Sequence, residues 1–139
     1  MKSKNILLVS LLLLIFLING YGQSAYLGLT KVEIRKLLLS DNDVKNVKET
    51  RDKEGVLMIQ CEHTGLINNF SVYGFQDDIH CSIIINLFQY SSMSVVLESL
   101  NRACTKTGTS RWTEYGKKNI GHIIDKQENS FWLYTFYDK

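Results

Sequence analysis

Three runs of alternating residues between positions 56 and 88 constrain the fold of this chain most strongly. The clearest run is residues 79–88, where one set of alternate side chains is almost wholly apolar: Ile79, Cys81, Ile83, Ile85 and Leu87. A period of two is typical of a β-strand that buries one face. Residues 56–63 and 67–75 also have strand character, and short polar turns separate the three runs. The sequence therefore predicts an antiparallel meander here.

Helical patterns flank this meander on both sides. Thr30 and Glu33 have the spacing of a capping box, which predicts a helix over residues 31–39. Ser91 or Ser92 is expected to cap a second helix that ends near Lys106. Its apolar residues recur at helical spacing: Met93, Val96, Leu97, Leu100, Ala103 and Cys104.

Four further segments have strand patterns, namely residues 44–51, 111–115, 119–126 and 130–137. The predicted fold class is therefore α+β: an antiparallel sheet (a meander plus C-terminal strands) with two helices packed against it. The expected order is α-β(3-4)-α-β(2-3). No internal repeat is evident in the sequence.

The N-terminus has the three-part layout of a secretory signal peptide. Lys2 and Lys4 precede an almost wholly apolar run, residues 6–18, and small and polar residues follow it. Thirteen residues at about 1.5 Å each span about 20 Å, short of the roughly 30 Å hydrocarbon core of a membrane. We expect residues 1–24 to be a cleaved signal and residues 25–139 to be a single exported domain, periplasmic or secreted, without a transmembrane segment. The cut follows Gly22 or Ser24.

Removal of the signal changes the charge of the domain. The whole chain has 16 basic and 14 acidic residues. Without Lys2 and Lys4, fourteen basic residues remain against the fourteen acidic ones, so the mature domain is formally neutral. A neutral domain offers no electrostatic case for binding nucleic acid or an anionic membrane.

The chain has three cysteines, Cys61, Cys81 and Cys104. An oxidising compartment permits a disulfide, and an odd count leaves at least one free thiol. In a simple meander, however, a whole strand separates Cys61 from Cys81, which places them about 9–10 Å apart. A disulfide needs Cα atoms within about 7 Å. Buried free thiols are therefore favoured over one disulfide, and the pairing stays open.

Residues with catalytic or metal-binding potential are few. Cys61 and His63 share a strand face and form the best local metal-like pair, but no Cys or His spacing typical of zinc occurs. His80 and His122 are the other histidines, and the acidic pairs fall in turns. No nucleophile elbow or glycine-rich phosphate loop is present. The sequence indicates no catalytic residue, no metal site and no cofactor, and it favours a protein that is not an enzyme.

The C-terminal segment of residues 131–137 is aromatic on both faces of its predicted strand. Phe131, Leu133 and Tyr137 would face the core. Trp132, Tyr134 and Phe136 would then face outward, joined by Trp112 and Tyr115. Two interpretations remain: a central strand covered on both sides, or an exposed aromatic surface for a partner. The candidate binding residues are Trp112, Trp132, Tyr134 and Phe136.

The start of the mature chain supplies a family resemblance. Tyr26-Leu27-Gly28-Leu29-Thr30-Lys31 leads directly into a helix, and this Gly-x-Thr helix start resembles that of small exported bacterial proteins. Outer-membrane assembly lipoproteins related to β-lactamase inhibitory proteins share such a start, although their lipidated Cys is absent here. The whole helix–sheet pattern resembles uncharacterised small exported α+β proteins of Gram-negative bacteria. The resemblance implies an exported domain and assigns no role to any residue.

Three functions are compatible with these features. The leading hypothesis is a non-enzymatic exported domain that binds a protein or cell-envelope partner. The first alternative is a domain that binds a small ligand in a pocket lined by aromatic residues. The second is a small hydrolase or redox enzyme, which would require His63, His80 or a carboxylate pair to converge in a cleft. The identity of the partner and the oligomeric state stay open.

Overall fold

The computed structural model describes residues 24–65 and 68–138. The predicted signal segment, apart from Ser24, lies outside the described residues. The helical elements are η1 (Ser24–Tyr26), α2 (Lys31–Ser40), η2 (Tyr90–Ser92) and α3 (Met93–Ala103). The strands are β1 (Val44–Arg51), β2 (Leu57–His63), β3 (Asn68–Phe75), β4 (Ile83–Gln89), β5 (Thr105–Gly108), β6 (Arg111–Glu114), β7 (Ile120–Lys126) and β8 (Ser130–Tyr137).

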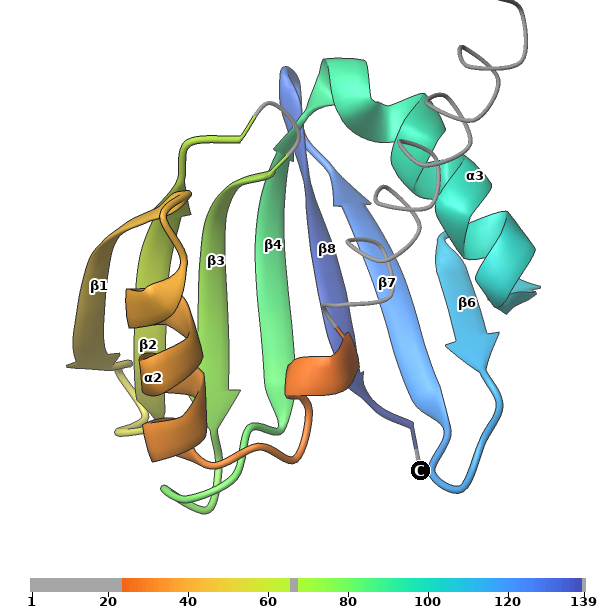
Figure 1. Ribbon diagram of the computed structural model, residues 1–139. Helices are drawn as coiled ribbons and strands as arrows, with labels where there is room; N and C mark the ends of the chain where they lie inside the picture. Colours follow the sequence, from red (N-terminus) through yellow and green to blue (C-terminus); the bar gives the residue numbers. More distant parts are fainter. Residues whose placement is uncertain (1–23, 66–67, 139) are drawn as a thin grey trace, which may run out of the picture.

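All eight strands form one antiparallel sheet in the order β1-β2-β3-β4-β8-β7-β6-β5 (Figure 1). The expected α+β class, with the order α-β(3-4)-α-β(2-3), is wrong. The described residues form mostly this one sheet, with two short α-helices of 10 and 11 residues, and four strands follow α3. The strand that the sequence did not predict is β5, whose four residues are all exposed. Its polar sequence has no alternation, and its strand conformation comes from pairing with β6 at the sheet edge.

The two halves of the chain repeat one order of elements. Each half is a short helix followed by four strands, and the halves join where β4 pairs with β8. That junction spans seven residue pairs, from Ile83 with Phe136 to Gln89 with Ser130. No repeat is evident in the sequence, because the same order of helices and strands requires only a similar hydrophobic pattern and not the same residues.

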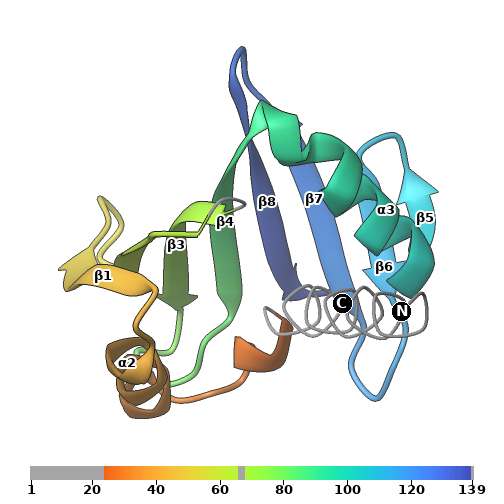
Figure 2. The same cartoon turned by 45° about the horizontal axis from the view of Figure 1, so that its top comes forward.

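Both helices pack on one face of the sheet, which we call the inner face. Ile34 and Leu38 of α2 belong to a core with Ile84 of β4, whereas Val96 and Leu100 of α3 belong to a core with Phe88 of β4. Ile84 and Phe88 are four residues apart on one strand, so their side chains point to the same side. Figure 2 shows that the two helices lie apart from each other, α2 near β1 and α3 near β6. The opposite, outer face carries no helix of the described chain.

The start of α2 has the predicted capping box. The Thr30 hydroxyl accepts from the amide of Glu33 at 3.3 Å, and the amide of Thr30 donates to the Glu33 carboxylate at 2.8 Å. The start of α3 differs from the prediction. Ser92 precedes the helix but makes no side-chain capping bond, and η2 supplies an extra helical turn instead.

Residues 79–82 do not belong to β4, although the alternation predicted a strand from residue 79. They pair with the segment before α2: the Gly28 amide donates to Cys81 oxygen and the Cys81 amide donates to Leu29 oxygen, both at 2.8 Å. These hydrogen bonds hold the segment that precedes α2 against residues 79–82. Among the described residues, none of the helices combines the length and the apolar character needed to cross a membrane.

Candidate functional site

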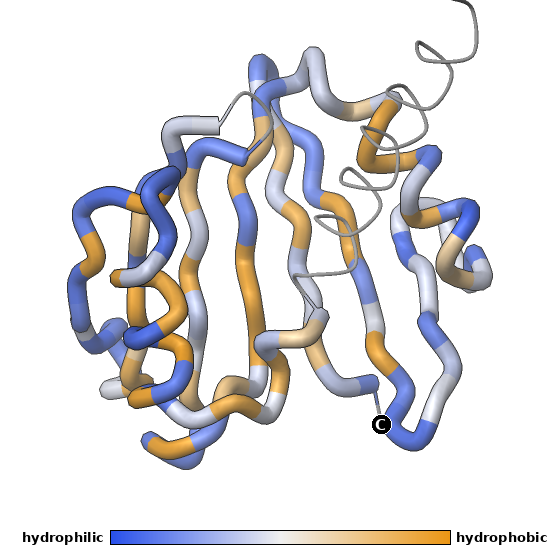
Figure 3. Tube along the Cα trace, in the orientation of Figure 1, coloured by the Kyte–Doolittle hydropathy of each residue, from blue (hydrophilic) through white to orange (hydrophobic). Residues whose placement is uncertain are grey.

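Strand β8 places the predicted aromatic residues on the outer face of the sheet. Trp132, Tyr134 and Phe136 are half-buried, whereas Phe131, Leu133 and Thr135, which alternate with them, are buried on the inner face. Each outer aromatic residue lies directly opposite an aliphatic residue of β4: Phe136 opposite Ile83, Tyr134 opposite Ile85 and Trp132 opposite Leu87. We call these six residues the outer apolar band. Figure 3 shows that part of β4 is hydrophobic without a break, which gives that strand an apolar side chain on both faces.

Two glycines on the neighbouring strands make room for this band. A Cβ atom on Gly121 of β7 would lie 2.7 Å from the Phe136 ring, and one on Gly74 of β3 would lie 2.7 Å from the Ile83 side chain. The Phe136 ring and the Ile83 side chain therefore lie over bare backbone. Arg111 lies at the edge, with its guanidinium 5.7 Å from the Phe136 ring and 2.7 Å from a carboxylate oxygen of Asp138. An apolar centre with charged residues at its margin is typical of protein interfaces.

Trp112 does not join the other three candidate binding residues. It lies on the inner face, pairs in register with His122 and is only 2 % exposed beneath α3. Its indole nitrogen donates to Asn101 at 2.8 Å, which satisfies the one polar group of a buried tryptophan. Tyr115 is 64 % exposed beyond the end of β6. The structure therefore brings Trp132, Tyr134 and Phe136 together and separates Trp112 from them.

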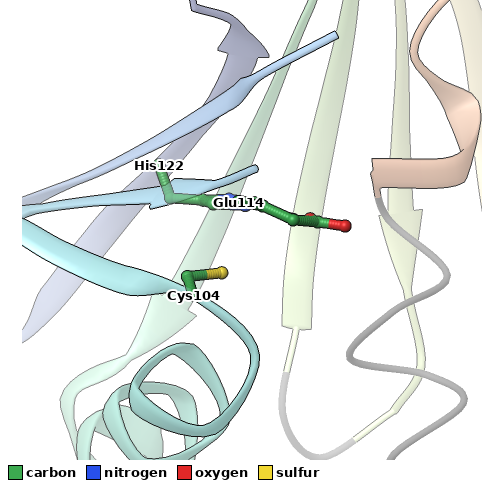
Figure 4. Close-up of side chains that lie close together, drawn as sticks. All are labelled: Cys104, Glu114 and His122. Carbon is green, nitrogen blue, oxygen red and sulfur yellow. The ribbon is translucent and has the colours of Figure 1, made fainter. Parts of the chain in front are cut away.

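A second constellation lies on the inner face, where Cys104, Glu114 and His122 converge (Figure 4). Their potential ligand atoms all lie within 4.8 Å of one another. Cys104 follows the end of α3, Glu114 ends β6 and His122 lies in β7. Trp112 is the register partner of His122, so Glu114, two residues further along β6, is its diagonal neighbour on the same face. The β5–β6 register places Cys104 beside Glu114.

His122 is held by one ring nitrogen only. Its Nδ1 lies 3.0 Å from the hydroxyl of Thr135 on β8. Its Nε2 is buried without a hydrogen-bond partner and lies 3.7 Å from a Glu114 carboxylate oxygen, which is too long for a hydrogen bond. The side chain of His122 is only 8 % exposed. A buried polar atom without a partner carries a free-energy cost of about 1–3 kcal/mol. The position of the His122 Nε2 atom beside the Cys104 and Glu114 side chains therefore calls for an explanation.

Burial sets the charge state of this cluster. Burial raises the pKa of the Cys104 thiol to about 11, and the nearby Glu114 carboxylate adds to the effect. Burial also lowers the pKa of His122, although Glu114 opposes that shift. The thiol is therefore protonated and the imidazole neutral at pH 7. This is unlike an activated cysteine nucleophile, whose thiol pKa is lowered.

The sequence did not reveal this cluster because its three residues are ten and eight positions apart on three different elements. None of the short spacings typical of zinc ligands connects them. The one available signal was strand pairing, since Glu114 and His122 flank the turn between two predicted neighbouring strands. Such pairing becomes informative only once the register is known.

The Cys61–His63 pair belongs to a different arrangement. His63 Nε2 lies 3.6 Å from the Cys61 sulfur and 2.8 Å from the Ser71 hydroxyl. The Ser71 hydroxyl donates to the Asn86 amide oxygen at 2.5 Å, and Asn68 donates to both Ser71 and Asn86. Because the serine proton points to Asn86, His63 must donate to the hydroxyl rather than accept from it. A catalytic serine requires the reverse.

His80 lies far from His63. His63 ends β2, close to the start of β3, whereas His80 follows the other end of β3. Eight residues of strand separate these ends by about 25 Å. His80 is exposed, and its Nδ1 lies 2.9 Å from a carboxylate oxygen of Asp77 in the turn after β3. His63 and His80, the two histidines that the enzyme hypothesis requires, therefore do not converge.

All three cysteines are free in the structure. Cys61 and Cys81 are buried in the core beneath α2, whereas Cys104 is half-buried beneath α3.

In comparisons with known proteins, no family model, no curated protein and no solved structure matches this chain. The resemblance to small exported α+β proteins therefore stays a prediction.

Proposed function

We propose that this protein is an exported, non-enzymatic domain that binds a folded protein partner through the outer apolar band. The observation that carries the proposal is the set of three aliphatic–aromatic pairs across β4 and β8, on the face without a described helix. These central strands span about 20 Å along the sheet, enough for the core of a protein contact. Aromatic residues are enriched at such cores because they bury large areas.

Charge favours a protein over other partners. The outer side of β1 has Lys45, which lies opposite Glu62 on β2, and Lys48, which lies opposite Gln60. The other margin has Arg111 and Asp125. Positive and negative charges thus alternate around a neutral centre. Nucleic acid and anionic lipid select a surface with a marked positive excess, which this face lacks.

The small-ligand alternative has less support. A hollow of the described surface runs along the exposed side of α2, and its lining is aliphatic and basic: Lys31, Val32, Arg35, Lys36, Leu39 and Ser40. It contains no aromatic residue, whereas the alternative requires a pocket lined by them.

Position-specific crosslinking in the cells that produce the protein tests the proposal. A photoreactive phenylalanine replaces Tyr134 in one variant and Tyr115, which is exposed outside the band, in the control. We expect a discrete crosslinked product from position 134 and none from position 115. Excess purified wild-type protein should reduce the yield of the crosslinked product, because it competes for the partner. The Trp132→Ala, Tyr134→Ala double variant should not reduce it.

Two outcomes would contradict the proposal. Equal products from both positions would indicate non-specific contact. A product with twice the mass of the chain, and no other, would indicate self-association instead of a different partner. The double variant Tyr90→Ala, Tyr115→Ala is the matched control for competition, because both tyrosines are exposed away from the band.

A further inference from the structure

We propose that Cys104, Glu114 and His122 bind one zinc ion on the inner face of the sheet, with the fourth coordination position open to an external ligand. This site is independent of the outer apolar band, because it lies on the opposite face of the sheet. The proposal begins with the convergence of a thiol, a carboxylate and an imidazole within 4.8 Å. These are the three side-chain types that zinc prefers.

The spacing of the ligand atoms suits a tetrahedral ion. Zinc binds sulfur at about 2.3 Å and nitrogen or oxygen at about 2.0–2.2 Å, so neighbouring ligand atoms lie about 3.3–3.6 Å apart. The His122 Nε2 and Glu114 Oε2 atoms are 3.7 Å apart. This distance is too long for a direct hydrogen bond and close to the edge of a zinc tetrahedron.

The unpartnered nitrogen of His122 supplies a second, independent argument. Its Nε2 is buried and makes no hydrogen bond, whereas Nδ1 is held by Thr135 at 3.0 Å. A histidine that binds a metal normally uses one nitrogen as ligand and donates from the other to a fixed acceptor. In His122, the Thr135 hydroxyl lies beside Nδ1 and can accept a proton from it, which leaves Nε2, directed toward Glu114, as the ligand nitrogen.

A catalytic triad fits the geometry less well. In a triad, one imidazole nitrogen faces the nucleophile and the other faces the orienting carboxylate. Here the carboxylate is near Nε2, and Nδ1 is occupied by a threonine hydroxyl. With Glu114 near Nε2 and Thr135 at Nδ1, no imidazole nitrogen is left to face the Cys104 thiol as its general base.

The donor set selects the class of metal. Calcium and magnesium prefer oxygen ligands only, so a site with sulfur and nitrogen disfavours them. Zinc accepts mixed sulfur, nitrogen and oxygen ligands. Sites with three protein ligands keep one position for water or an external group. The side chain of Glu114 is 30 % exposed, which leaves the cluster accessible from solvent.

The test uses the purified, reduced protein and Co²⁺ as a spectroscopic substitute for zinc. We expect one Co²⁺ per chain, a thiolate-to-cobalt charge-transfer band, and displacement by Zn²⁺. Cys104→Ser and Glu114→Gln should each weaken binding at least tenfold. His80→Gln and His63→Gln, which alter histidines outside the cluster, should leave it unchanged.

A second measurement needs no substitution and so remains decisive if a variant fails to fold. Zn²⁺ should slow the alkylation of Cys104 in the wild-type protein and leave that of Cys61 and Cys81 unchanged. Absence of both the charge-transfer band and the protection of Cys104 would overturn the proposal. Unchanged affinity in both Cys104→Ser and Glu114→Gln would also overturn it, since the ion would then bind elsewhere.

Discussion

The hydroxyl of Thr135 lies 3.0 Å from Nδ1 of His122, so a buried contact between β8 and β7 determines which nitrogen of the imidazole is available. Taken as whole residues, Thr135 is 1 % exposed and His122 is 6 % exposed. With Nδ1 held in this way, Nε2 is directed toward Glu114 rather than toward the sheet. The relationship connects the centre of the sheet to the proposed zinc site.

Replacement of Thr135 by valine tests this positioning role. Valine has nearly the same shape but lacks the hydroxyl, so Nδ1 loses its partner. We expect zinc affinity to fall about 10–100-fold, the usual effect of removing such an outer contact. Thr135→Ser keeps the hydroxyl and should retain most of the affinity. Zinc titrations of the two variants check this, and equal losses in both would show that the hydroxyl is irrelevant.

Zinc should also stabilise the fold, because its ligands come from three separate elements. At a free zinc concentration 100 times the dissociation constant, the free energy of unfolding should rise by about 2.7 kcal/mol. Urea unfolding with and without zinc measures this change, and a chelator should reverse it. Glu114→Gln should show a smaller increase at the same zinc concentration. An identical increase in that variant would argue against Glu114 as a ligand.

The Phe136 ring explains why position 121 is glycine. An alanine Cβ there would lie 2.7 Å from the ring, which forces the ring or the strand to move. We expect Gly121→Ala to reduce the free energy of unfolding by about 1–3 kcal/mol, as overpacking does. Gly116→Ala is the control, since its Cβ would meet only the Lys118 oxygen at 3.6 Å. Urea denaturation compares the two, and equal effects would contradict the packing argument.

The three thiols should differ in reactivity. Burial raises the pKa of Cys61 and of Cys104 to about 11 and that of Cys81 to about 12, so accessibility and not the pKa separates Cys104 from Cys61. Cys61 and Cys81 are almost wholly inaccessible, whereas Cys104 is half-buried. In native metal-free protein near neutral pH, a maleimide should therefore modify Cys104 first, as followed by mass spectrometry, and all three at similar rates in denaturant. Modification of Cys61 as fast as Cys104 would show that the core beneath α2 opens readily.

The turn after β3 should make the stability of the fold depend on pH in the acidic range. The Asp77 carboxylate accepts bonds from the His80 amide, the His80 ring and the Ile79 amide, which lower its pKa to about 2. A carboxyl whose pKa is lowered on folding stabilises the protein above its unfolded pKa of about 3.9. That contribution is lost as the pH falls from about 4 to about 2.

The variant Asp77→Asn cannot titrate at this position. Wild type should therefore be more stable than the variant above pH 4, and the difference should shrink toward pH 2. Urea midpoints measured across this range check the expectation. A difference that stays constant with pH would show that the carboxylate charge does not matter.

Local patterns predicted individual elements well because neighbouring residues determine them. The capping box of Thr30 and Glu33 needs only residues three positions apart, and it forms as expected. The alternation in β8 separates Phe131 and Leu133 from Trp132 and Tyr134, and the burial pattern follows it. By contrast, β5 has no pattern in its own sequence and becomes a strand only beside β6.

The expected fold class was wrong because one eight-stranded sheet, and not a combination of helices and sheet, makes up most of the described chain. The order of its strands could not be predicted, because it depends on contacts between distant segments. Nothing near β4 in sequence indicates that β8, more than 40 residues later, is its neighbour. Trp112 was grouped with Trp132 for the same reason. Both are aromatic strand residues, and only the register shows that Trp112 faces α3 while Trp132 faces outward.

The sequence by itself determined the hydrophobic period of the helices and strands, the capping box of α2 and the inward or outward alternation in β8, because these depend on residues only a few positions apart. Only the tertiary structure decided that β4 joins β8 and that Cys104, Glu114 and His122 converge. These contacts arise when helices and strands from different parts of the chain pack together and bury their apolar faces. A single local pattern is compatible with many such packings, so it cannot select one.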